Sequence, residues 1–135
     1  MKKLFIGLMA LALAFTAAVS LTGCGPTAGL QEISWDDLKD AKLYDSYGAV
    51  TKTVTYASDG TSTSTTSDEA TLSGAAVKLA VAGTKASFDV IKALNPNSTG
   101  KVCANYDYSK IVTYIYTKDS DGKLVSEGIT TYKKK

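Results

Sequence analysis

The 135-residue chain contains no histidine, and all 15 of its positive charges are lysines, so arginine is absent too. The lack of histidine excludes serine–histidine and cysteine–histidine catalysis and histidine-ligated zinc or haem. The lack of arginine argues against bidentate reading of phosphate or guanine. Cysteine is scarce as well, with Cys24 and Cys103 alone. These absences remove common routes to catalysis, metal binding and nucleic-acid recognition.

The first part of the chain has the pattern of a secretory signal peptide. Lys2 and Lys3 precede an apolar run over residues 4–19, which is the order of charge and hydropathy that such peptides show. A membrane-spanning helix is the alternative, because residues 4–21 nearly reach the minimum spanning length. The residues that follow this run decide between the two.

Leu21-Thr22-Gly23-Cys24 resembles the lipobox of bacterial lipoproteins. The resemblance implies diacylglycerol on the Cys24 thiol, cleavage before that residue, and acylation of the new amino group, commonly with palmitate. It divides the chain into a signal peptide (1–23), a lipidated tether (24–32) and one α+β domain (33–135). The expected location is the cell envelope, on the outer face of the cytoplasmic membrane or on an outer membrane, with acylated Cys24 inserted in the lipid bilayer.

Loss of the signal peptide changes the charge balance and the use of cysteine. Without Lys2 and Lys3 the chain has 13 lysines and 13 acids, so it is neutral and electrostatic recruitment of nucleic acid has no support. With Cys24 lipidated, no intramolecular disulfide forms. Cys103 is then either a small buried hydrophobe, which we favour, or a reactive thiol, and a disulfide to another chain is also open.

Local patterns predict an α+β domain, with a small antiparallel sheet and about two helices on one face. Ser34 and two following acids start a helix that reaches about residue 43, and a second helix spans 84–94. Segment 70–82 is ambiguous, and we favour a strand over 75–82 because of Gly74 and the alternating apolar residues. Alternation and turn residues place the remaining strands at 49–57, 61–66, 101–108, 110–118 and 123–132.

The second half of the chain carries a weaker resemblance. Residues 84–132 resemble the helix-plus-three-strand unit of β-lactamase-inhibitor-like lipoprotein domains, through Val90-Ile91, Pro96 and Asp121-Gly122-Lys123-Leu124. Asn95 stands where that family usually has glycine. The resemblance implies a fold for this half only, and no functional residue is carried over from it.

Tyrosine is the residue type most suggestive of a binding surface. Tyr106 and Tyr108 are expected on one face of a strand, and Tyr114 and Tyr116 on one face of the next. Aromatic rings of this kind stack on sugars or peptide side chains, although they also close cores. We predict that these four residues form a surface for an envelope protein or a cell-wall glycan.

The acidic residues have simpler explanations than metal binding or catalysis. Asp119 and Asp121 resemble part of a calcium loop, but its first and last ligands are missing, so we interpret 119–122 as a hairpin turn. Asp36-Asp37 and Asp68-Glu69 are adjacent acids at helix starts rather than a catalytic pair across a cleft. No cofactor, metal or catalytic residue is therefore predicted.

The sequence thus favours a lipid-anchored, non-enzymatic binding or assembly module of the cell envelope. One alternative is a passive surface lipoprotein without a dedicated ligand. The other is an enzyme acting on envelope material through carboxylates or Cys103. The three C-terminal lysines are expected either to touch anionic lipid or, as we favour, to form a frayed end.

Overall fold

One sheet contains all seven strands of the part of the chain that the computed structural model describes, residues 27 and 29–135. The predicted signal peptide and Cys24 lie outside these residues. The strand order is β1-β5-β6-β7-β2-β3, and β4 also pairs with β2. Every pairing is antiparallel. The elements are β1 (Gln31–Ile33), η2 (Asp37–Lys39), β2 (Tyr47–Tyr56), β3 (Ser62–Thr66), β4 (Ala70–Leu72), α1 (Gly74–Leu94), β5 (Ser98–Ala104), β6 (Lys110–Lys118) and β7 (Leu124–Lys134).

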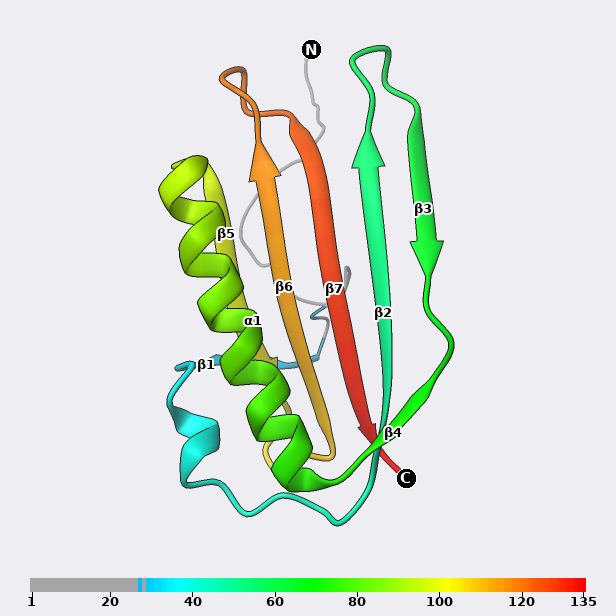
Figure 1. Ribbon diagram of the computed structural model, residues 1–135, viewed down its shortest axis with the longest axis vertical. Coiled ribbons are helices and arrows are strands. Elements are labelled where there is room, and N and C mark those ends of the chain that lie inside the picture. Colours follow the sequence, from blue (N-terminus) through cyan, green and yellow to red (C-terminus); the bar gives the residue numbers. More distant parts are fainter. Residues whose placement is uncertain (1–26, 28) are drawn as a thin grey trace. The chain divides into compact units, whose positions relative to one another are not determined.

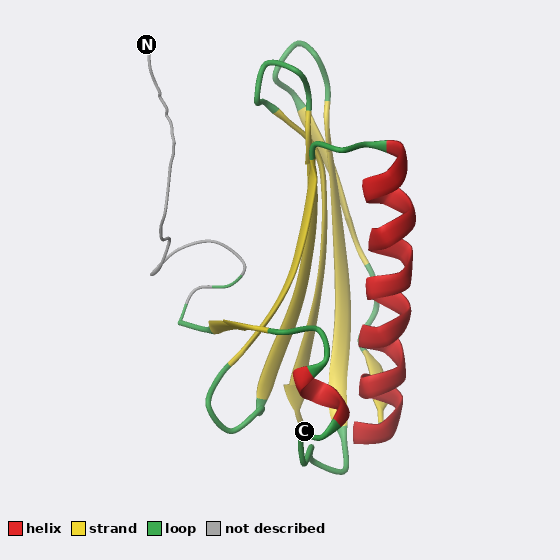
Figure 2. Cartoon of the chain, turned by 90° about the vertical axis from the view of Figure 1, so that its left-hand side faces the viewer, coloured by secondary structure: helices red, strands yellow, loops and turns green. Residues whose placement is uncertain are grey.

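The long helix α1 lies along one face of this sheet, in front of β5 and β6 (Figures 1 and 2). The α+β class is therefore confirmed. The two predicted helices are not, because the described chain has a single α-helix, accompanied by the short 3₁₀ segment η2. The compact unit starts at Gln31, where β1 pairs with β5, so the last two residues assigned to the tether belong to the sheet.

The prediction of a strand over 75–82 is wrong, because this segment forms the first part of α1. Ser73 caps the helix, and its Oγ accepts a hydrogen bond of 3.1 Å from the Ala76 N–H. Val77 and Val81 are four residues apart and both are buried, whereas Leu79 is exposed. Helical spacing of the two buried valines therefore outweighs the alternation of Val77, Leu79 and Val81.

The predicted first helix forms only the single 3₁₀ turn of η2. Its expected start is present, since the Ser34 N–H donates to Asp37 Oδ2 at 2.9 Å and the Asp36 N–H to Ser34 Oγ at 3.3 Å. The turn closes with an Ala41 N–H to Leu38 C=O hydrogen bond of 3.3 Å. One turn is enough to bury Leu38 in the core, and short helices gain little by extending in water.

The core lies between α1, η2 and one face of the sheet. Its buried residues come from η2, α1, β2, β5, β6 and β7. Tyr47 is buried with its hydroxyl group. That hydroxyl donates to the Tyr108 C=O at 2.7 Å and accepts from the Tyr44 N–H at 3.2 Å, so its polar atom is satisfied. The buried members are Leu38, Tyr47, Ala49, Val77, Val81, Val102, Ala104, Ile111 and Tyr132.

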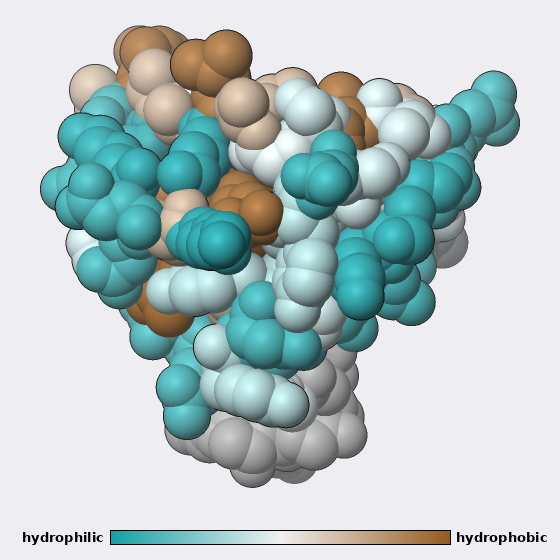
Figure 3. Space-filling view, turned by 90° about the horizontal axis from the view of Figure 1, so that it is seen from below, coloured by the Kyte–Doolittle hydropathy of each residue, from teal (hydrophilic) through white to brown (hydrophobic). Residues whose placement is uncertain are grey.

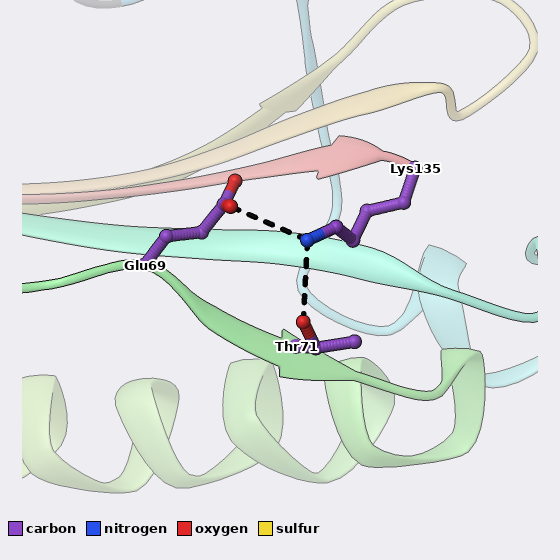
Figure 4. A network of polar contacts seen from close by, with 3 residues as sticks. All are labelled: Glu69, Thr71 and Lys135. Carbon is purple, nitrogen blue, oxygen red and sulfur yellow. Dashed lines mark hydrogen bonds and ion pairs between the residues drawn. The ribbon is translucent and has the colours of Figure 1, made fainter.

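The C-terminal lysines are held in the sheet, and the expectation of a frayed end is wrong. β7 continues to Lys134, and Lys135 bonds to Glu69 and Thr71 at 3.3 Å each, as Figure 4 shows. The Glu69 carboxylate lies over Gly48 of β2, where a Cβ atom would clash with it. The small residue in β2 therefore makes room for the contact that holds the chain end.

Gly100 of β5 provides a test of how tightly α1 packs on the sheet. A Cβ atom there would lie 2.8 Å from the ring of Phe88, which stacks on Trp35 with a centroid distance of 6.3 Å. We expect Gly100→Ala to lower the free energy of unfolding by about 1–3 kcal/mol, as overpacking does. Gly128→Ala in β7 is the matched control, because no atom lies within 4 Å of its Cβ position. Equal effects in urea unfolding would contradict this account of the packing.

Candidate functional site

The face of the sheet turned away from the core carries a group of tyrosines. Side chains alternate along a strand, and Ile111 and Thr113 point toward α1, so Val112, Tyr114 and Tyr116 point to the opposite side. We call this side the helix-free face, because both helical elements of the described chain pack on the other one. The prediction that Tyr114 and Tyr116 share a face is confirmed by this register.

Tyr114 and Tyr116 form the centre of a compact cluster. Their ring centroids are 5.1 Å apart, and each ring has a lysine Nζ above it. Lys101 lies 5.9 Å from the Tyr114 centroid and Lys118 lies 5.7 Å from that of Tyr116. These distances are within the range of cation–π attraction.

Glu127 of β7 joins this group to β2. Its two carboxylate oxygens accept short hydrogen bonds from the hydroxyls of Tyr56 and Tyr114. The carboxylate is half-buried between the two phenols and is placed by the pairing of Val54 with Glu127 and of Tyr116 with Glu127. We call the set of Tyr56, Lys101, Tyr114, Tyr116, Lys118 and Glu127 the tyrosine–glutamate cluster.

The carboxylate and burial together keep the tyrosines protonated. Burial, followed by the hydrogen bond to Glu127 and its negative charge, raises the pKa of Tyr56 to about 12. The same causes raise the pKa of Tyr114 further above its usual value. Both hydroxyls are therefore donors over the physiological pH range, and the cluster presents fixed rings and lysine charges rather than a proton acceptor.

Tyr106 and Tyr108 are not part of this cluster. The predicted strand over 101–108 ends at Ala104, because the side chain of Asn105 bonds to Ser109 Oγ at 2.6 Å and to the Lys110 N–H at 3.0 Å and so forms a turn. Tyr106 in this turn is 93% exposed. Tyr108 packs against the core and has a left-handed φ of 59°. The four predicted tyrosines thus divide into a pair on the sheet, a single exposed ring and a core residue.

A cleft of about 610 Å³ lies between the β2–β3 and β6–β7 turns, next to Tyr56. Two of its acids hold the turns themselves. Asp59 Oδ1 accepts from the N–H and hydroxyl of Thr61, which lowers the pKa of Asp59. Asp119 Oδ1 accepts from the N–H groups of Asp121 and Lys123 at 2.9 Å each. The interpretation of 119–122 as a hairpin turn is confirmed.

The other chemical groups singled out in the sequence are placed as follows. Cys103 is buried, with 2% of its surface exposed, on the same side of the sheet as Val112. No cluster of three or more cysteines or acids suited to a metal ion occurs among the described residues. Within the same part of the chain, no helix has the length and apolarity needed to span a membrane.

In comparisons with known proteins, no family model, curated protein or solved structure matches the chain. The resemblances to lipoproteins and to β-lactamase-inhibitor-like domains stay predictions.

Sequence reasoning missed four members of the cluster that act together with the predicted tyrosines: Tyr56, Lys101, Lys118 and Glu127. The strand predicted over 49–57 contains Tyr56, but the contact of this residue with Glu127 depends on β2 pairing with β7 rather than only with β3. Lys101 is opposite Tyr114 through the β5–β6 register. Because β5 and β6 are consecutive strands, a hairpin between them could have been predicted, and it would have placed Lys101 beside Tyr114. The β2–β7 pairing joins the two ends of the domain, and no local sequence signal indicates it.

The cluster predicts a specific change in tyrosine titration. In Glu127→Gln the pKa of Tyr56 is expected to fall from about 12 toward the ordinary value of about 10, because the negative charge is removed while burial remains. A pKa raised on folding stabilises the fold below pH 10, and this contribution is lost as the pH rises through 12. Between about pH 10 and pH 12 the free energy of unfolding of Glu127→Gln should therefore decrease less than that of the wild type.

The measurement is the pH dependence of the ring-carbon NMR signal of Tyr56, with unfolding followed in parallel. Glu32→Gln, on exposed β1, is the matched control. Identical Tyr56 titrations in wild type and Glu127→Gln would show that the carboxylate does not act on this phenol.

Proposed function

We propose that the protein is a lipid-anchored component of the cell envelope that binds another envelope component through the helix-free face of its sheet. The membrane part of the proposal rests on Leu21-Thr22-Gly23-Cys24. The binding part rests on one observation, the tyrosine–glutamate cluster around Tyr114 and Tyr116. The partner is an envelope protein or a cell-wall glycan.

The cluster has the properties of a recognition surface. Tyrosine rings offer a large apolar area at little cost in conformational entropy, and the lysines beside them supply hydrogen-bond donors. The bonds of Glu127 to Tyr56 and Tyr114 hold two rings in place before a partner arrives, which reduces the entropy lost on binding. Sugars and peptide side chains both suit such a surface.

The geometry gives less support to an enzyme. Cys103 is buried, and a nucleophilic thiol has to reach its substrate. The carboxylate of Glu127 is occupied by two phenol donors, and Asp59 and Asp119 are occupied by turn N–H groups. These groups are arranged to stabilise the fold, and binding therefore remains the function that we propose.

Partner capture in the native host tests the proposal. The full-length protein with a tag after Lys135 is cross-linked in intact cells, and captured proteins and glycan fragments are identified by mass spectrometry. We expect Tyr116→Ala to reduce capture of a recurring partner about tenfold or more, as loss of an interface tyrosine does. Tyr106→Ala is the matched control, since it removes the same ring from an exposed turn away from the cluster.

Thermal unfolding of both variants establishes that they remain folded. Equal capture by wild type and Tyr116→Ala would reject the cluster as the binding surface. Absence of any partner above background would favour a passive surface lipoprotein instead.

A further inference from the structure

The cleft between the β2–β3 and β6–β7 turns lies directly beside the tyrosine–glutamate cluster. The ladder of β2 and β7 ends at the pair Thr55–Ser126, and beyond it the two chains separate into their turns at the upper end of the sheet (Figure 1). The volume of about 610 Å³ is in the range of pockets that hold small ligands. Tyr56 lines this cleft and also donates its hydroxyl to Glu127. The cleft and the cluster therefore adjoin through a shared side chain.

The cluster also leads along β6 toward the cleft. Tyr114, Tyr116 and Lys118 are alternate residues of this strand and share the helix-free face. Two residues of a strand rise about 6.6 Å, so these three side chains extend over about 13 Å in one line. The next residue, Asp119, lines the cleft. A ligand that follows this line is therefore extended rather than compact.

The lining of the cleft combines carboxylates with a small apolar wall. Asp59 and Asp119 each use one oxygen, Oδ1, to accept hydrogen bonds from their own turn. An ionised carboxylate has about four acceptor positions, so both side chains can accept further hydrogen bonds. Val125 is 38% exposed and supplies apolar surface beside Tyr56. Such a lining suits a ligand that has both hydroxyl donors and apolar C–H groups.

The charges of the cleft and the cluster together favour a neutral ligand. Three acids line the cleft: Asp59, Asp119 and Asp121. With Lys123 as the one base of this lining, the acids are in excess and repel an anion. In the cluster, Lys101 and Lys118 lie over the tyrosine rings and repel a cation. A ligand that contacts both parts of the surface is therefore best accommodated without a net charge.

Exposed apolar side chains on this surface are too few for the core of a protein interface. The large ones of the described chain are Leu79, Val90, Leu94, Tyr106 and Val125. Of these, Val125 alone adjoins the cleft or the cluster. At the lower end of the sheet, Figure 3 shows brown apolar patches separated by teal hydrophilic surface. Protein interfaces have an apolar core, whereas a sugar offers C–H groups to aromatic rings and hydroxyls to acceptors.

We propose that the partner is a neutral, linear glycan that stacks on the rings of Tyr114 and Tyr116 and continues into the cleft, where the three carboxylates accept hydrogen bonds from its hydroxyl groups. This inference rests on the proposed function and narrows it, since it selects a glycan over an envelope protein. The turn contacts of Asp59 and Asp119 hold two of the acceptors in place before binding, which reduces the entropy lost when the glycan binds.

Co-sedimentation with insoluble wall glycan of the native host, freed of protein by protease, tests this inference. The full-length protein is purified in detergent, mixed with the glycan and centrifuged, and the bound fraction is measured. We expect Ser58→Trp, which places a large ring in the cleft, to weaken binding about tenfold or more, as loss of a central contact does. Ser87→Trp is the matched control, because it makes the same change at an exposed serine of α1 away from the cleft.

Asp121→Ala tests the acceptors without filling the cleft. The Asp121 side chain has no hydrogen-bond partner among the described residues, so its removal should leave the turn folded. We expect this variant to weaken binding about three- to tenfold, the usual effect of losing one hydrogen bond. Because the ligand is neutral, the bound fraction of the wild type should be the same at about 50 mM and about 500 mM NaCl. Thermal unfolding establishes that each variant is folded.

The inference is overturned if the wild type does not sediment with the glycan, if Ser58→Trp and Asp121→Ala both bind as well as the wild type, or if salt abolishes binding. These outcomes are distinct from failure of the proposed function. The proposed function survives each of them if Tyr116→Ala still reduces capture of an envelope component in cells. It fails if Tyr116→Ala changes neither capture in cells nor sedimentation with the glycan.

Discussion

Replacing Cys24 with serine is expected to abolish incorporation of a labelled fatty acid into the protein. Serine lacks the thiol that would receive diacylglycerol in the proposed anchor, in which each buried acyl methylene would contribute about 0.8 kcal/mol. Labelling of cells that express the full-length protein should therefore fall from a strong signal in the wild type to background in the variant.

Cys103→Ala is the matched control, since it removes the other cysteine, which is buried in β5. This variant should be labelled as strongly as the wild type. Equal labelling of Cys24→Ser and wild type would contradict a lipid on Cys24.

Replacing Leu38 with alanine is expected to lower the free energy of unfolding by about 2–5 kcal/mol, the usual range for removing a fully buried leucine side chain. Leu38 is 2% exposed and packs in the main core from the single turn of η2. A short 3₁₀ turn has little stability of its own. The loss of unfolding free energy in Leu38→Ala therefore measures how strongly the core contacts of Leu38 hold η2 in place.

Leu79→Ala in α1 is the control with the same chemical change. Leu79 is 75% exposed, and alanine is a better helix former than leucine, so stability should change by less than about 0.5 kcal/mol. Urea unfolding at low protein concentration keeps the two measurements on the monomer. A loss below about 1 kcal/mol for Leu38→Ala would show that the 34–41 segment is not part of the core.

Much of the sheet was predictable because its signals are local. Alternation of apolar and polar residues around Val54 indicated β2, and the turn residues Ser58-Asp59-Gly60 and Asp119–Gly122 indicated the two hairpins. The structure confirms both, with Gly60 and Gly122 at left-handed φ angles of 90° and 83°. A turn of this kind depends on a few adjacent residues, and the sequence contains all of them.

The helices were less predictable because their bounds depend on what they pack against. A strand was expected over 75–82 and a helix only over 84–94, yet α1 runs through both segments, since Val77, Val81 and Phe88 all contact the sheet side of the fold. In contrast, the strong start at Ser34 leads to one turn only. Tertiary burial overrides local propensity in both cases.

The candidate site was predictable only as far as single strands. Tyr114 and Tyr116 share a face through the two-residue period of β6, which the sequence shows directly. The contribution of Glu127 depends on the sheet order, in which β7 lies between β6 and β2. Pairing between strands so distant in sequence is decided by the whole fold, and no short motif encodes it.

The most direct test of the central claim is the mass of the N-terminal peptide of the full-length protein purified from membranes of its native host. The account predicts a peptide that begins at Cys24 and carries a thioether-linked diacylglycerol, with or without a further acyl chain on its amino group. A peptide that retains residues from 1–23, or one that begins at unmodified Cys24, would contradict it.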